Sequence, residues 1–415
     1  MLSKTAQKTT VKLANTTILS NRNFLFLWVA SIFSGLSLSI YLLAETWYVL
    51  RVLKQPASLG IIMLLTTIPR VLFMFIGGVL ADRMKRSNIM FISNGIRGLL
   101  VLLMVLLVIN DLMTIWSLGV FALLFGVLDA FFWPANQSFI PQIVNKEQLV
   151  KANSYIQTTN QLTTIIGPML AGIVIEFGNF SGVFILTSLL LLISSLLVKQ
   201  MKEVKADHKK KESTALLELK EGLHYIKGMP FLITFMCISL FTNFFLVGPV
   251  NIGLPLLVDQ SLQGSVMDLS YLESAFAIGM IIGALLVGFL NIKKRRPIIN
   301  ISLLGILSTA TLFLSQMNMV WQGIIILIIV GFCLSISNIL SASLVQEMTD
   351  PQIIGRVQSL MSTASMGFIP LSLGLVSILI GFGISIQLII FISTSFLILF
   401  TLFILIKVKV IWTVD

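Results

Sequence analysis

Charge is scarce in this sequence. Only 11% of its 415 residues are Asp, Glu, Lys or Arg, and its mean hydropathy is +1.00. In soluble domains about a quarter of the residues are charged. The composition therefore excludes a soluble globular fold. We expect an all-α protein that crosses a membrane many times.

Metal-ligating and nucleophilic residues are also scarce. The two cysteines, Cys237 and Cys333, lie inside apolar runs, and the two histidines, His208 and His224, lie in the polar middle of the chain. This pattern excludes a disulfide framework and the known zinc-binding motifs. The sequence has no glycine-rich phosphate loop and no hydrophilic segment long enough for a nucleotide-binding domain. We expect no enzyme, no metal and no bound cofactor.

Long apolar segments are abundant. A helix needs roughly 20 apolar residues to cross the hydrocarbon layer of a bilayer. Twelve segments meet this requirement, at residues 24–50, 57–81, 88–109, 114–138, 153–177, 180–199, 230–257, 268–291, 297–316, 319–344, 355–381 and 384–406. They predict twelve transmembrane helices.

Polar segments divide these helices into two sets of six. The predicted parts are a tail at 1–23, a six-helix bundle at 24–199, a basic loop at 200–229, a second six-helix bundle at 230–406 and a tail at 407–415. The first 23 residues are followed by an apolar run that is too long for a signal peptide and has no cleavage site. We interpret them as a cytoplasmic tail.

The cations lie almost entirely on one side of the predicted spans. The exceptions among the 28 lysines and arginines are Arg51 and Lys54 on the opposite side, and Arg70 and Arg97 within spans. Loops rich in lysine and arginine stay in the cytoplasm. The distribution therefore predicts that both termini and the central loop are cytoplasmic, in a bacterial cytoplasmic membrane. It also argues against nucleic acid as the partner of a chain with a net charge of +11.

The basic loop at 200–229 contains a second pattern. Its apolar residues Leu216, Leu219, Leu223 and Ile226 recur at helical spacing, opposite charged residues. Such a helix is expected to lie in the membrane interface, where lysines can also contact anionic lipid headgroups. A regulatory partner helix is the alternative.

The two halves of the sequence resemble each other. Short matches recur about 210 residues apart: Gly78 with Gly288, Asp129 with Asn338, and Pro141-Gln142-Ile143 with Pro351-Gln352-Ile353. A constant offset of half the chain indicates a duplicated six-helix unit. In transporters built this way, the substrate binds between the repeats near the middle of the bilayer.

Several motifs resemble those of the major facilitator superfamily. Between spans two and three the sequence reads Gly78-Val-Leu-Ala-Asp82-Arg83-Met-Lys85-Arg86. Three further segments resemble the drug and macrolide efflux branch: Asp129-Ala-Phe-Phe-Trp-Pro134-Ala, Leu219-Lys-Glu-Gly222, and Gln346-Glu347 with Gly355-Arg356-Val357. The resemblance implies a monomeric transporter with two six-helix bundles and no cofactor, driven by the proton gradient.

The resemblance also implies a conformational latch formed by Gly78, Asp82, Arg83 and Arg86. Asp82 ends span two, close to the expected N-terminus of span eleven, where the helix dipole attracts a carboxylate. The alternative is an ordinary basic cytoplasmic loop. Lys85 departs from the family pattern, which usually has glycine there, so the geometry of this turn is left open.

Ionisable residues inside the spans are candidate functional groups, because each is costly in hydrocarbon. We predict that Glu45 in span one and Asp129 in span four carry protons. Glu45 can alternatively be an interfacial residue that reaches water, and Asp129 can form a structural ion pair with Arg97. Arg70 in span two can neutralise Glu45 or bind an anionic group of the substrate.

Two further groups of residues complete the candidate site. Gly167, Pro168 and Gly172 in span five resemble part of a motif of proton-coupled exporters, in which proline bends the helix and glycine allows close packing. The predicted substrate cavity is formed by Tyr41, Glu45, Arg70, Phe132, Asn160, Phe241 and Asn243. The alternative for its aromatic members is ordinary packing against lipid or neighbouring helices.

The sequence as a whole predicts a secondary transporter that exports amphipathic small molecules by alternating access, in exchange for protons. An endogenous lipid, glycolipid or siderophore is the alternative cargo. A membrane scaffold or sensor that transports nothing is the alternative from another functional class.

Overall fold

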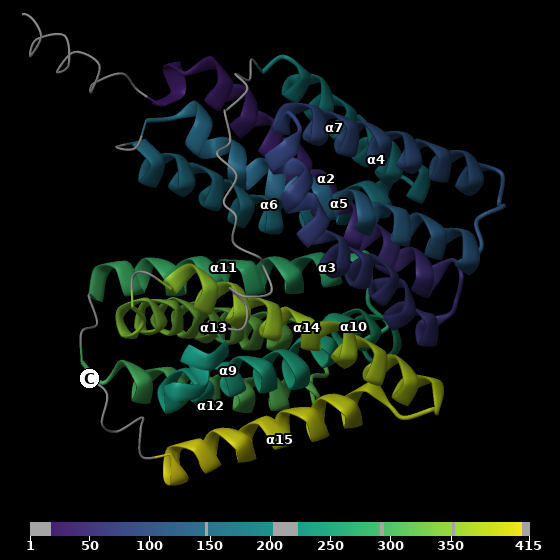
Figure 1. Ribbon diagram of the computed structural model, residues 1–415. Coiled ribbons are helices and arrows are strands. Elements are labelled where there is room, and N and C mark those ends of the chain that lie inside the picture. The colour runs from purple at the N-terminus through teal and green to yellow at the C-terminus, as the bar shows by residue number, and fades with distance from the viewer. Residues whose placement is uncertain (1–17, 146–147, 202–222, 291–293, 351–352, 409–415) are drawn as a thin grey trace, which may run out of the picture.

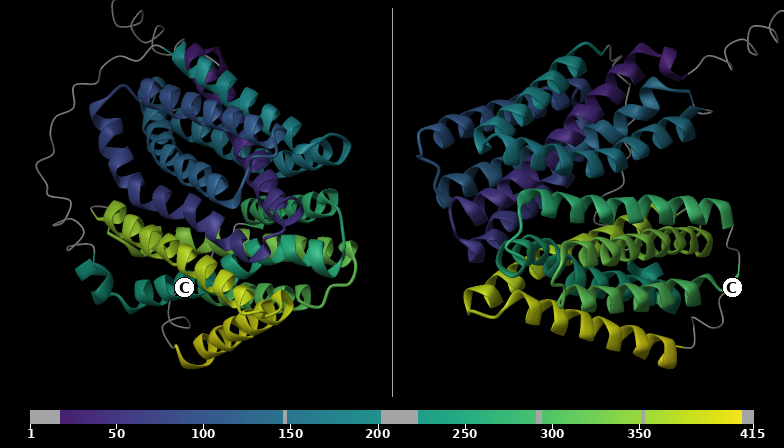
Figure 2. Two further views of the ribbon diagram at one scale, coloured as in Figure 1. Left: turned by 90° about the vertical axis from the view of Figure 1, so that its right-hand side faces the viewer. Right: turned by 180° about the vertical axis from the view of Figure 1, so that it is seen from behind.

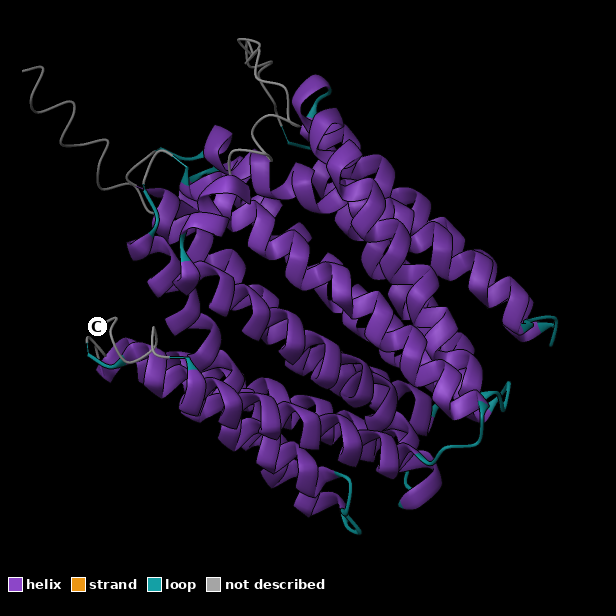
Figure 3. Cartoon of the chain, turned by 60° about the horizontal axis from the view of Figure 1, so that its bottom comes forward, coloured by secondary structure: helices purple, strands orange, loops and turns teal. Residues whose placement is uncertain are grey.

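The computed structural model describes residues 18–145, 148–201, 223–290, 294–350 and 353–408. These residues form helices and short turns, with no strand among them (Figure 3). Within these ranges, twelve helical segments are long and apolar enough to cross a membrane. The predicted all-α protein with twelve membrane spans is confirmed.

Each of the first six spans is a single helix. They are α2 (Arg22–Arg51), α3 (Leu59–Arg83), α4 (Arg86–Ile109), α5 (Ile115–Ile143), α6 (Leu149–Phe177) and α7 (Phe180–Lys199). Polar residues start several of them. The side chain of Asn21 accepts hydrogen bonds from two backbone N–H groups of α2, and those of Thr114 and Asn179 each accept one from α5 and α7. These caps satisfy donors that a helix start leaves without partners.

The seventh span is irregular, and the last five are single helices. Span seven consists of α9 (Pro230–Thr242), the π-helical turn η4 (Asn243–Val247), α10 (Gly248–Leu256) and the π-helical turn η5 (Leu257–Ser261). The remaining spans are α11 (Val266–Leu290), α12 (Arg296–Leu314), α13 (Val320–Met348), α14 (Ile354–Gly381) and α15 (Ile386–Lys407). The sequence gives no sign of the two wide turns, because they replace ordinary helix without interrupting the apolar run.

Equivalent helices pack in the same way in the two sets of six. In the first set, α3 lies against α5, and a Cβ on Gly126 would be only 2.1 Å from the carbonyl oxygen of Thr66. In the second set, α11 lies against α13, and a Cβ on Gly331 would be 2.1 Å from the carbonyl oxygen of Phe276. Glycine lets the two backbones touch at both places. The shared packing fits the internal repeat in the sequence.

The two sets form two groups of helices that lie side by side (Figures 1 and 2). We call the end of the bundle that the cation distribution predicts to be cytoplasmic the inner end, and the opposite end the outer end. The groups meet where α6 lies on α11 and where α3 lies on α14.

Polar contacts join the two groups in the outer half of the bundle. The Nε atom of Arg51 on α2 is 2.7 Å from Oδ1 of Asp259 in η5, and Ser377 on α14 donates to the carbonyl oxygen of Ala57 at 2.6 Å. Nearer the middle, Ser274 on α11 donates to the carbonyl oxygen of Ile165 at 3.0 Å. The structure is therefore closed at its outer end.

The predicted interfacial helix lies largely outside the described residues, since 202–222 are not described. Residues 223–228 are helical. Ile226 is buried against the inner ends of the second group, in a cluster with Phe231, Leu344 and Val357.

Candidate functional site

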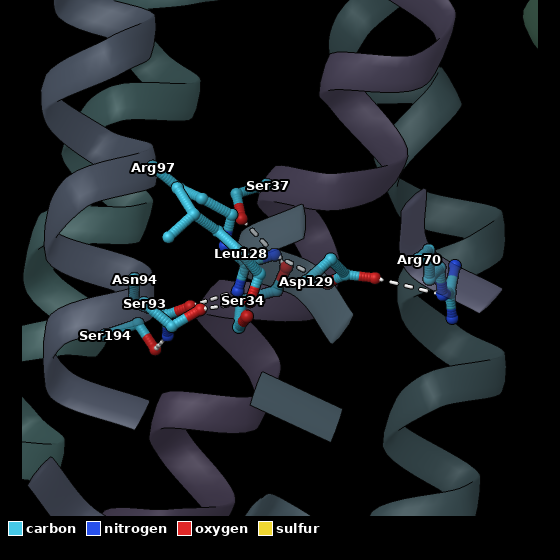
Figure 4. Close-up of polar contacts among 9 residues, drawn as sticks. All are labelled: Ser34, Ser37, Arg70, Ser93, Asn94, Arg97, Leu128, Asp129 and Ser194. Atoms are coloured by element: carbon cyan, nitrogen blue, oxygen red, sulfur yellow. Dashed lines mark hydrogen bonds and ion pairs between the residues drawn. The ribbon is translucent and has the colours of Figure 1, made fainter. Parts of the chain in front are cut away.

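A charged cluster lies inside the first group of helices, around Asp129 of α5 (Figure 4). Its side chain is buried, with 3% of its surface exposed. Oδ1 accepts a hydrogen bond of 2.7 Å from Nη1 of Arg97 on α4, and Oδ2 lies 3.2 Å from Nε of Arg70 on α3. One carboxylate thus faces two guanidinium groups from two neighbouring helices, and the cluster has a net charge of +1 when all three are ionised.

Arg97 is held rigidly in this cluster. Its residue is fully buried, and its Nη2 donates to Oδ1 of Asn94 one turn earlier on α4. The rings of Phe125 and Phe132 each have their centroid 5.1 Å from its Cζ atom, where a cation interacts favourably with a ring face. Removing one partner of such a buried pair usually costs about 3–5 kcal/mol. Arg97 is therefore a structural anchor for Asp129.

Polar residues behind the cluster connect it to two more helices. Asn94 donates to Oγ of Ser194 on α7 at 2.9 Å, and Ser194 donates to the carbonyl oxygen of Ala30 on α2 at 2.8 Å. Ser93 donates to the carbonyl oxygen of Leu128 on α5 at 2.5 Å. Figure 4 shows Ser93, Asn94, Leu128 and Ser194 near Asp129. The orientation of Asp129 thus depends on four helices besides its own, α2, α3, α4 and α7.

Arg70 occupies a different environment from Arg97. Its side chain is 37% exposed, and its contact with Asp129 is made through Nε. The sequence left open whether Arg70 neutralises Glu45, but the carboxylate beside it is Asp129. From the sequence, only Arg97 was expected to pair with Asp129, because the sequence does not show that α3 also faces this carboxylate.

Glu45 lies apart from these cations. The residue is only 3% exposed, and its Oε1 accepts a hydrogen bond of 2.8 Å from the hydroxyl of Tyr41. Tyr41 stacks on Phe125 with 4.3 Å between ring centroids. The burial contradicts the alternative in which Glu45 reaches water at the interface. Phe125 contacts both Tyr41 and Arg97, and so it links the surroundings of the two carboxylates.

The latch motif is partly described. A Cβ on Gly78 would have no atom within 4 Å, so this face of α3 is open. The side chains of Asp82 and Arg83 lie outside the described part of the chain. Arg86 is buried and donates from Nε to Oγ of Ser138 on α5 at 2.8 Å. Its contact with Ser138 holds α4 on α5 within the first group.

Lys85 fits the turn between α3 and α4 without strain. Its backbone has φ −64° and ψ 121°, which is an extended conformation open to any residue. The absence of glycine at this position therefore does not disturb the turn.

The bend motif lies at the contact between the two groups. Pro168 is inside the continuous helix α6, and its carbonyl oxygen accepts a hydrogen bond of 2.8 Å from Ser270 of α11. A Cβ on Gly172 would be 2.3 Å from Oγ of the same Ser270, and a Cβ on Gly167 would be 2.3 Å from Cβ of Ser39 on α2. The two glycines therefore allow α6 to approach one helix of each group.

The remaining cavity candidates do not all face one space. Tyr41 and Phe132 are buried in packing inside the first group. Phe241 stacks on Phe400 of α15 with 4.0 Å between ring centroids, so it points away from the first group. Asn160 on α6 is half-buried, and Asn243 lines a cavity in the second group. The expected aromatic site is thus distributed over separate packing regions.

A model of the Major Facilitator Superfamily matches residues 27–375. Macrolide efflux protein A of Streptococcus pyogenes is 25% identical over 358 residues, covering 85% of this chain and 87% of that protein. Enterobactin exporter EntS of Shigella boydii is 26% identical over 295 residues, covering 69% and 68%. The crystal structure of nucleoside transporter NupG is similar in fold, with a TM-score of 0.75 at 15% identity over 94% of this chain and 99% of that chain.

Proposed function

Because the chain belongs to the Major Facilitator Superfamily, we propose that it exports amphipathic small molecules of the drug or macrolide kind in exchange for protons. The family match and the twelve spans identify a multi-pass transporter of the bacterial cytoplasmic membrane and not an enzyme. The proposal adds the direction of transport, the cargo and the coupling ion. The name of the macrolide efflux relative supports export of such a cargo.

The observation that carries the proposal is the position of Asp129 between a buried and a half-exposed arginine. When Asp129 is ionised, it attracts both guanidinium groups. When it takes up a proton, the attraction to Arg70 weakens, and this side chain can turn toward a substrate. Binding of the proton and of the substrate would then be linked through Arg70, as an exchange mechanism requires.

Glu45 is proposed as the second proton-carrying group. It has no cation beside it in the described structure, and its one hydrogen bond comes from Tyr41. Both residues lie on α2, which also carries Arg51 of the closed outer end. A change of protonation at Glu45 can therefore act on the outer contact through a single helix.

Substrate-driven proton movement in proteoliposomes tests the proposal. Macrolides, cationic dyes and lipid analogues are screened with the normal protein and with Glu45→Gln and Asp129→Asn. We expect proton flux with at least one compound class, and its loss with retained substrate binding in at least one of the two variants. Glu176→Gln and Asp111→Asn are matched controls, because both residues are exposed, and they should leave flux unchanged. Normal flux in both Glu45→Gln and Asp129→Asn would contradict the coupling assignment.

A siderophore is the second candidate cargo. One relative is an enterobactin exporter, and the spare positive charge at Arg70 suits an acidic molecule. Flux driven only by an acidic siderophore would favour this cargo. Flux driven only by lipid analogues would favour a lipid, and no flux with any compound would favour the scaffold or sensor.

A further inference from the structure

A crevice of about 840 Å³ lies between α12 and α13, in the outer half of the second group of helices. Small-molecule sites commonly measure roughly 300–1,000 Å³. α12 packs mainly against α13 and α15, whereas α11 and α14 make the main contacts with the first group (Figure 1). The crevice therefore lies away from the contact between the two groups, where cargo is expected to bind.

The crevice opens toward lipid. On α12, Ile306 and Phe313 are 51% and 55% exposed, and on α13, Trp321 and Ile325 are 57% and 50% exposed. Both helices are long and apolar enough to cross the membrane. In a bilayer, the isoleucines and the phenylalanine therefore contact hydrocarbon and not water.

Gly305 of α12 creates the hollow. A Cβ added there would meet no atom of the described chain within 4 Å, whereas a Cβ on Gly323 of α13 would be 2.7 Å from Cδ2 of Leu272. Gly323 thus lets two helices of the chain approach each other, and Gly305 leaves space on the outside. Glycine weakens a helix relative to alanine, and at Gly305 no neighbouring helix of the described chain requires it. The space is suited to a group from outside the chain.

The length of the crevice matches one leaflet of a bilayer. Along α12 the rise from Ser302 to Phe313 is roughly 17 Å, at about 1.5 Å per residue. Half of the hydrocarbon core of a bilayer is about 15 Å thick. One acyl chain of the outer leaflet can therefore lie along the whole crevice.

The polar groups of the lining lie mainly at its outer end. Gln316 is exposed in the turn between the helices, and Trp321 lies at the start of α13. Tryptophan is common at this level, where membrane meets water. Deeper in, the hydroxyl of Thr309 donates to the carbonyl oxygen of Gly305 at 2.8 Å and is thus already bonded within α12. Apart from Ser302 at the inner end, the crevice is polar at the interface and apolar inside, as a lipid is.

The lining residues carry no charge. A charged headgroup would therefore gain no ion pair in the crevice, and it can stay hydrated at the membrane surface. Recognition would depend on the acyl chain and not on the charge of the headgroup.

We propose that the crevice binds one acyl chain of a phospholipid from the outer leaflet. The chain lies along α12 from Phe313 to Ser302, and the amide of Gln316 donates to an ester carbonyl oxygen of the same lipid. The bound chain fills the hollow at Gly305 and joins α12 to α13. This site goes beyond the proposed export function and requires neither transport nor protons.

Photo-crosslinking of the full chain tests this site. The chain is stripped of lipid in detergent and titrated with a phosphatidylethanolamine that carries a diazirine at the end of one acyl chain. We expect labels at Ser302, Ile306 and Ile329 that saturate at low probe concentration. Labels at Phe396 and Leu399 of α15, which are also exposed, should keep rising with the probe. Parallel titrations at both places would show bulk lipid only and overturn the proposal.

Two further measurements test the orientation of the lipid and the lack of headgroup selection. A probe with the diazirine beside the ester should label Gln316 and Trp321 instead of the deep residues. The same labels from both probes would overturn the assigned orientation. Unlabelled phosphatidylethanolamine and phosphatidylglycerol should displace the probe equally, and a strong preference for either would contradict recognition by the chain alone.

Variants locate the binding. Gly305→Leu places a side chain in the path of the acyl chain, and such overpacking should lower crevice labelling about tenfold. Labelling of α15 should not change. Gly381→Leu on α14 is the matched control, because an added Cβ there also meets no atom within 4 Å and the residue lies outside the crevice. Normal crevice labelling in Gly305→Leu, or an equal loss in Gly381→Leu, would overturn the assignment.

Thermal unfolding and mass measurements exclude other causes. Without lipid, Gly305→Leu should unfold at the same or a higher temperature, since leucine favours the helix. Added phospholipid should raise the melting temperature of the normal chain more than that of Gly305→Leu, because a ligand of the folded state stabilises it. An equal rise in both would contradict the site. A dimer in nanodiscs that Gly305→Leu dissociates would assign the crevice to a second copy of the chain and overturn the lipid site.

Discussion

At the scale of residues, the two arginines beside Asp129 have the same charge and different environments. The side chain of Arg97 is 1% exposed and that of Arg70 is 37% exposed. The free energy of an ion pair depends strongly on its exposure, because water screens exposed charges and stabilises them when they are separated. We therefore infer that Arg97 contributes mainly to stability, and we propose that Arg70 contributes to transport.

This assignment gives a matched pair of predictions. Arg97→Gln should lower the free energy of unfolding by about 3–5 kcal/mol, because it breaks a buried ion pair. Arg70→Gln should lower it by less, because Arg70 is partly exposed to water and Asp129 keeps its buried pair with Arg97, and should reduce transport. Thermal unfolding of the purified variants and uptake into proteoliposomes measure the two effects. Equal losses of stability would contradict the division of roles.

At the scale of helices, the contact between α6 and α11 depends on a glycine, Gly172, which has no side chain. Gly172 lies so close to α11 that an added Cβ would be 2.3 Å from Oγ and 3.1 Å from Cβ of Ser270. Close contacts of this kind are found where small residues let helices approach. The fit of α6 on α11 is one of the contacts that close the outer end.

We predict that Gly172→Val opens the outer end. The added methyl groups would separate α6 from α11 and weaken the bond from Ser270 to Pro168. Spin labels at Phe177 and Tyr271, both exposed, in a chain with serine at Cys237 and Cys333, should show longer distances by electron–electron double resonance.

The control for this experiment is Gly305→Val on α12. An added Cβ there would meet no atom within 4 Å. It should leave the distance distribution of the normal protein unchanged. A distribution for Gly172→Val that matches this control would show that the glycine does not govern closure.

At the scale of the whole molecule, the orientation in the membrane and the closed outer end together lead to one prediction. The outer end is closed, and the face of α3 at Gly78 is open. If the inner end is cytoplasmic, Gly78→Cys should react with a membrane-impermeant maleimide in inside-out vesicles and not in right-side-out vesicles. Leu112→Cys, exposed in the turn at the outer end, should show the opposite pattern. Reaction of both cysteines from the same side would contradict the arrangement.

The sequence by itself determined the number of spans, the repeat and the family. Each of these depends on local or additive properties: the length of apolar runs and short motifs at fixed spacing. The twelve spans expected from apolar length match the twelve helical spans of the structure, with ends that differ by a few residues. The two π-helical turns of span seven were missed, since they leave hydropathy unchanged.

Only the tertiary structure decided which side chains meet. The sequence offered Arg97 and Arg70 as ionisable residues, but the angle at which α3, α4 and α5 pack brings both to Asp129 and leaves Glu45 with Tyr41. In the same way, Thr242 looks like any helical threonine until the turn after it and the spans around it leave its hydroxyl unbonded. Contacts between distant residues depend on how helix faces are oriented against each other, and hydropathy does not encode that orientation.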